Sequence, residues 1–93
     1  MRIDKAEAIL GALLEDLAAI EHERWSHWQA HLHARAERRA DGSLVIPAEL
    51  VARWERQIAT PYAQLSEPEK DMDREQVRRY LALIARAFAE NEA

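Results

Sequence analysis

Residues 61–75 read PYAQLSEPEKDMDRE and carry the clearest structural signal in the chain. Ser66 suits the position before a helix, because its hydroxyl can accept a free backbone N–H from the first turn. Glu69 stands three positions later and can accept the N–H of Ser66 in return, which completes a capping box. Pro68 falls in the first turn, where its missing N–H costs nothing. These residues predict a helix that begins at residue 67.

Apolar spacing extends this helix and predicts a long one before it. The helix from residue 67 is expected to reach about residue 90, because its apolar residues recur with helical spacing. Residues 4–39 are expected to form one long helix or two nearly continuous ones, with a heptad-like stripe. Gly11 either weakens this helix by about 1 kcal/mol or lets another helix approach closely. The two stripes consist of Val77, Tyr80, Leu81, Ile84 and Phe88, and of Ile3, Ala6, Leu10, Leu13, Leu17 and Ile20.

The middle of the chain combines a turn, an extended run and a second helix. Asp41-Gly42 is a turn signal, and residues 43–46 are prone to extended structure. Pro47 opens a helix that Thr60-Pro61 ends, with Leu50, Val51, Trp54 and Ile58 as its apolar face. We therefore expect an all-α, mainly helical fold. It has three principal helices, the first of them long, and one short extended segment between helices one and two.

Composition narrows the class of protein. The 93 residues suit a single domain, with a motif core at about residues 18–90 and a helical extension at residues 3–18. No cysteine is present, which excludes disulfides and thiolate chemistry. A net charge of -4 argues against nucleic acid as a partner, and no apolar run approaches the ~20 residues of a membrane span. We expect a cytoplasmic protein without a cofactor.

Several polar and aromatic groups allow a functional or a structural interpretation. Glu23, His27 and His31 are four residues apart, the spacing of a metal site on one helix face, but a solvated face explains them better. The three arginines near residues 35–39 could bind an anion, although helix-dipole complementation accounts for them. The tryptophans Trp25, Trp28 and Trp54 are interpreted mainly as core anchors rather than as a stacking wall for a base. Acidic residues at the start of the last helix fit the helix dipole, with metal or basic-partner binding through Glu69 and Asp73 as the alternative.

Two motifs resemble the ryanodine-receptor repeat domain, or RyR domain. The specific one is Pro61-Tyr62-x-x-Leu65-Ser66-Glu67-x-Glu69-Lys70-x-x-Asp73-Arg74-Glu75, and the less specific one is Glu21-His22-Glu23-Arg24-Trp25. The resemblance covers about half of the chain and departs from the family pattern at residues 41–59. Small bacterial and phage proteins carry single copies of similar segments.

The resemblance implies a small, mainly helical, non-enzymatic interaction domain. Repeats in the receptors come in tandem pairs, so a single copy is expected to pair with itself as a homodimer. Association of the receptor class with adenine nucleotides implies a ligand-binding alternative that uses His22, Trp25, Tyr62 and Arg74. A structural role for these four residues is the competing interpretation. A metal-dependent enzyme built on the acidic clusters is a third hypothesis, although no metal ligands are assigned.

Overall fold

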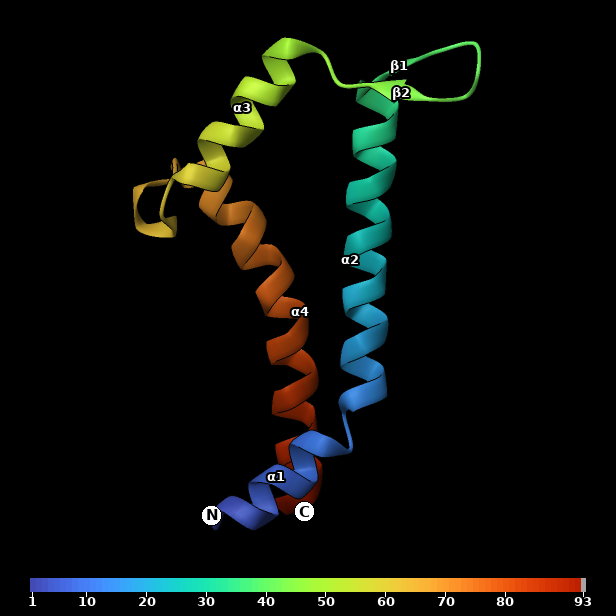
Figure 1. Cartoon of the computed structure of the whole chain (residues 1–93). Helices are drawn as coiled ribbons and strands as arrows, with labels where there is room; N and C mark the ends of the chain where they lie inside the picture. Colours follow the sequence, from blue (N-terminus) through green and yellow to red (C-terminus); the bar gives the residue numbers. More distant parts are fainter. Residues whose placement is uncertain (93) are drawn as a thin grey trace. The chain divides into compact units, whose positions relative to one another are not determined.

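The computed structural model describes residues 1–92 and is mainly helical, which confirms the predicted fold class (Figure 1). Within these residues, four α-helices accompany a short 3-10 helix, η1, and a two-stranded sheet. In chain order the elements are α1 (Ile3–Gly11), α2 (Leu14–Arg35), β1 (Glu37–Arg38), β2 (Leu44–Val45), α3 (Ala48–Ala59), η1 (Tyr62–Gln64) and α4 (Glu67–Glu92).

The first predicted helix is divided, so the expectation of three principal helices is wrong by one. A turn at residues 12–13 separates α1 from α2, and the N–H of Leu13 donates to the carbonyl of Leu10 at 3.0 Å. This i to i−3 bond tightens the backbone at the end of α1. It also coincides with the burial of Leu13, which is only 8% exposed. A Cβ added to Gly11 would meet nothing within 4 Å, so this glycine does not serve close helix approach.

The α2 helix ends at Arg35, before the predicted limit of residue 39, because the next residues form a hairpin. The strands β1 and β2 pair antiparallel, with Glu37 opposite Val45 and Arg38 opposite Leu44. Asp41 stabilises the turn, since its Oδ1 accepts the N–H and the hydroxyl of Ser43 at 2.9 and 2.6 Å. Gly42 has a φ of 91°, which favours glycine. Arg38 and Arg39 therefore belong to the hairpin and not to a helix end.

Two compact units make up the described chain, and both long helices contribute to each of them. Unit 1 contains residues 1–24 and the α4 residues from Met72 onward, and unit 2 contains residues 25–71. The expectation of a single domain stays a prediction. None of the helices in residues 1–92 is long and apolar enough to cross a membrane.

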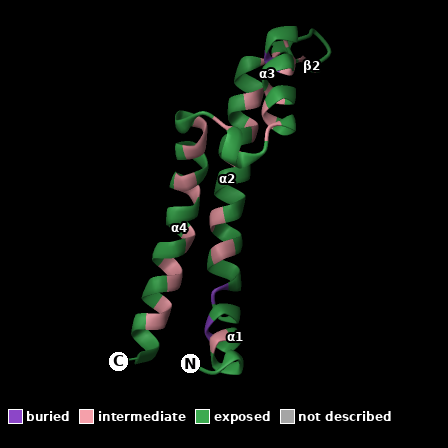
Figure 2. Ribbon diagram, turned by 90° about the vertical axis from the view of Figure 1, so that its left-hand side faces the viewer, coloured by how far each residue is buried: buried purple, intermediate pink, exposed green. Residues whose placement is uncertain are grey.

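Each unit has a small core. In unit 1, Ile9 and Leu13 are buried around the turn between α1 and α2, where Figure 2 shows the purple segments. In unit 2, Leu50 of α3 is buried, and the ring of Trp54 meets that of Trp28 edge to face at 5.3 Å. No other described residue is classed as buried. Most of the apolar surface of these helices is therefore only partly covered.

Three residues that the sequence assigns to the apolar stripes of α3 and α4 are exposed instead. Ile58 of α3 is 83% exposed, and Val77 and Leu81 of α4 are 49% and 56% exposed. Each predicted stripe is wider than the part of its helix that packs against another element. On α3, Leu50 is buried and Trp54 is partly covered, whereas Ile58, one turn beyond Trp54, is exposed.

Candidate functional site

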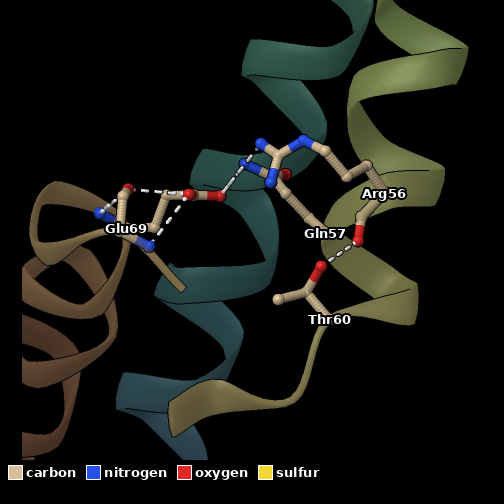
Figure 3. A network of polar contacts seen from close by, with 5 residues as sticks. Arg56, Gln57, Thr60 and Glu69 are labelled. Atoms are coloured by element: carbon tan, nitrogen blue, oxygen red, sulfur yellow. Dashed lines mark hydrogen bonds and ion pairs between the residues drawn. The ribbon is translucent and has the colours of Figure 1, made fainter. Parts of the chain in front are cut away.

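Glu69 connects α3 to α4 in unit 2 through several polar contacts (Figure 3). Its Oε1 accepts the hydroxyl of Ser66 at 2.7 Å and the N–H of Ser66 at 3.3 Å, and the hydroxyl in turn accepts the N–H of Glu69 at 3.4 Å. The predicted capping box is therefore confirmed. Its other oxygen, Oε2, accepts Nε2 of Gln57 at 2.8 Å and lies 3.5 Å from the guanidinium of Arg56. One carboxylate thus joins the end of α3 to the start of α4.

These contacts explain the acidity of Glu69. Hydrogen bonds from Ser66 and then Gln57 lower the pKa of Glu69 from 4.5 to about 2, because they favour the charged form. The side chain is 19% exposed. A general acid or base at neutral pH needs a pKa much nearer 7. The geometry therefore gives Glu69 a structural role in joining helices.

A second polar cluster joins α2 to α4 within unit 1. Glu21 accepts hydrogen bonds from Arg24 and from the hydroxyl of Tyr80, and Glu23 pairs with Arg79. The Arg24 bond, followed by the Tyr80 bond, lowers the pKa of Glu21 to about 2, and the carboxylate raises the pKa of Tyr80. The Glu21 side chain is 51% exposed. Exposed pairs of this kind set orientation more than stability.

The four predicted ligand residues are divided between the units. His22, exposed on α2, and Arg74, half-buried on α4, belong to unit 1. Trp25 on α2 and Tyr62 on η1 belong to unit 2 and are 55% and 48% exposed. Nζ of Lys70 on α4 lies 5.8 Å from the ring centre of Tyr62 on η1, which is a cation–π contact between the two elements. Ligand binding by the four residues stays a prediction.

The helix-face metal hypothesis meets competing contacts. His31 stacks on Trp28 at 5.5 Å between ring centres, and Glu23 pairs with Arg79. The described residues contain no group of three or more metal-ligating side chains placed to hold an ion. Glu23 therefore serves an ion pair between α2 and α4, and His31 serves ring packing against Trp28.

A groove in unit 2 is the concave feature that sequence reasoning missed. It lies between the hairpin and α3, with Val45, Ile46, Pro47 and Val51 as its apolar lining and the carboxylates of Glu37 and Glu55 beside them. The apolar spacing predicts Val51 on the apolar face of α3, but a groove also depends on where the hairpin folds back, which this spacing does not show. The arrangement offers an apolar surface with negative charge, and it contains no nucleophile.

Comparison with protein-family models, with curated proteins and with solved structures finds no match. The class of protein is therefore defined by the structure alone, as a small mainly helical protein with little buried core. Glu21 and Glu69, whose pKa values are lowered, join helices to one another, and many of its large apolar side chains are exposed.

Proposed function

We propose that this chain is a small, non-enzymatic helical interaction domain whose first partner is a second copy of itself. The observation that carries the proposal is the imbalance between core and surface. Twelve large hydrophobic residues are exposed in residues 1–92, whereas three are buried. Single exposed apolar residues are ordinary, but faces of them usually mark an interface.

The spacing of these residues supports association over chance exposure. Ile3 and Leu10 are seven residues apart on α1, and Leu14 follows at the start of α2 with 67% exposure. Part of the predicted stripe, including Leu13, is core, so the remainder forms a surface next to that core. The resemblance to the tandem RyR repeats supports pairing by analogy alone. A cytoplasmic location remains part of this proposal.

The contacts of the acidic residues support a non-catalytic function. Glu21 and Glu69 are held as charged hydrogen-bond acceptors, with pKa values of about 2. Carboxylates held in this way contribute to helix contacts rather than to proton transfer at neutral pH. A metal-dependent enzyme is accordingly the least supported alternative.

Nucleotide binding is the second candidate, and one observation favours it. Trp25 and Tyr62 present exposed aromatic rings, and such rings can stack on a base. Thermal melting with a panel of adenine nucleotides tests this candidate, because a ligand at 100 times its dissociation constant adds about 2.7 kcal/mol of stability. A clear rise in melting temperature with one nucleotide would favour it over the interaction domain.

Light scattering coupled to size exclusion tests the proposal directly. Over micromolar to submillimolar concentrations we expect the mass to rise from the 10.7 kDa of one chain to that of two. A single-chain mass at every concentration would overturn self-association. A single-chain mass together with stabilisation by a nucleotide would instead support ligand binding as the function.

A further inference from the structure

Two helix faces, on α3 and α4, carry some of the apolar residues that the core leaves out. On α3, Val51, Glu55 and Ile58 follow one another at helical spacing, and Ala48 and Ala52 share their side of the helix. Ile58 is 83% exposed. We call these five residues the α3 face. Its alanines let a second helix approach closely, because interaxial distance depends on the side chains at the contact.

The second face lies on α4. Val77, Leu81 and Ala85 are four residues apart, and Arg78 lies three residues before Leu81 on the same side of the helix. Val77 and Leu81 are 49% and 56% exposed. We call Val77, Arg78, Leu81 and Ala85 the α4 face. It pairs an apolar row with positive charge.

The two faces carry side chains of opposite charge, Glu55 on α3 and Arg78 on α4. Within residues 1–92, the side chains of Glu55 and Arg78 take part in no hydrogen bond or ion pair. Four of the five residues of the α3 face line the groove against the hairpin, where Glu37 adds a second carboxylate. An unpaired charge that becomes buried with an apolar face costs free energy unless the partner supplies the opposite charge. The occupant of the α3 face must therefore be apolar and basic.

We propose that the α3 face of one copy packs against the α4 face of a second copy, with Glu55 paired to Arg78 of the partner subunit. The inference rests on the proposed self-association and names two of the surfaces that take part in it. In a two-fold pair the contact occurs twice, because each copy contributes one α3 face and one α4 face. Both apolar rows are then covered, and both charges are neutralised. The buried area is twice that of a single helix contact.

Charge reversal tests the pairing. Glu55→Arg and Arg78→Glu each place like charges at both contacts of the pair, so each should raise the dissociation constant of the dimer by about tenfold or more. Glu90→Arg and Arg86→Glu are the matched controls, since they change net charge equally at exposed positions outside the two faces. Sedimentation equilibrium gives the dissociation constants. Circular dichroism melting of each variant checks that the helices form.

Mixing the two reversed variants is the decisive measurement. In a mixed pair, the Arg introduced at position 55 faces the Glu introduced at position 78, and the native Glu55 faces the native Arg78. The mixture should therefore recover an affinity close to wild type, although each variant alone associates weakly. A contact within one copy cannot produce this recovery.

The outcomes separate this inference from the proposed function. A wild-type dimer whose dissociation constant is unchanged by Glu55→Arg would overturn the α3–α4 pairing and leave self-association standing. A mixture that associates no better than its components would overturn the pairing as well. A monomeric wild-type chain would overturn both.

Discussion

Glu69 makes both a local contact, with Ser66, and a contact with a residue distant in the sequence, Gln57. Its Oε1 belongs to the capping box with Ser66, and its Oε2 holds Gln57 at the end of α3. The charged form is therefore stabilised by contacts that exist only in the folded chain. Loss of the cap and loss of the charge should each weaken the connection between α3 and α4, but under different conditions.

Ser66→Ala is expected to lower the free energy of unfolding by about 1 kcal/mol, because the first turn of α4 loses its side-chain acceptor. Urea denaturation followed by circular dichroism measures the change. Ser66→Thr is the matched control, since it keeps a hydroxyl at the same position. An unchanged urea midpoint for Ser66→Ala would show that the hydrogen bonds of Ser66 add no net stability.

Acid should destabilise the fold through Glu69. Its pKa is about 2 in the folded chain and near 4.5 when unfolded, so its stabilising contribution is complete above about pH 5 and is lost as the pH falls toward 2. Glu69→Gln should lower stability at neutral pH and reduce the further loss between pH 5 and pH 2. Glu90→Gln removes a carboxylate at an exposed position of α4. Equal pH slopes in the two variants would contradict this prediction.

At the scale of elements, features set by residues close in the sequence can be predicted from it, whereas features set by contacts between distant residues cannot. The start of α4 is evident from sequence because Ser66 and Glu69 are three residues apart. Its contact with Gln57 spans 12 residues and depends on the path of the chain through η1. The sequence allowed one long helix or two nearly continuous ones here, but it did not locate the division, because the apolar stripe from Ile3 to Ile20 continues through it. The burial of Leu13 accompanies the break, and burial is a tertiary property.

The two glycines should respond in opposite ways to alanine. Gly11 lies in the last turn of α1 with open space around its Cβ position, so Gly11→Ala should stabilise the fold by about 0.5–1 kcal/mol. Gly42 has a φ of 91°, so Gly42→Ala should destabilise it by about 1 kcal/mol or more. Thermal melting of both variants measures the difference. Destabilisation by Gly11→Ala would show that α1 requires flexibility at its end.

For the whole molecule, sequence patterns predict helices better than they predict what the helices bury. The stripes on α3 and α4 were correct as helical signals, yet Ile58, Val77 and Leu81 are exposed. A stripe shows that an apolar neighbour is needed, but it does not say whether the same chain provides one. The groove beside α3 was missed for the same reason, since it depends on where the hairpin folds. Three buried residues make a modest core, and oligomerisation is a common way to add buried area at this chain length.

Stability should accordingly depend on protein concentration, in a way that separates core from interface. Above the dissociation constant, association adds about 1.4 kcal/mol of stability per mole of dimer for each tenfold rise in concentration, so the melting temperature should increase with concentration. Leu81→Gln should remove this increase and leave melting of the dilute chain nearly unchanged. Met72→Gln is the matched control, because Met72 is 70% exposed and lies on the opposite side of α4 from Leu81.

Leu13→Ala should instead cost about 2–4 kcal/mol at every concentration, because this side chain is buried. Differential scanning calorimetry over a hundredfold range, about 10 to 1,000 µM, measures all four proteins. Equal effects of Leu81→Gln and Met72→Gln would contradict an interface on this side of α4.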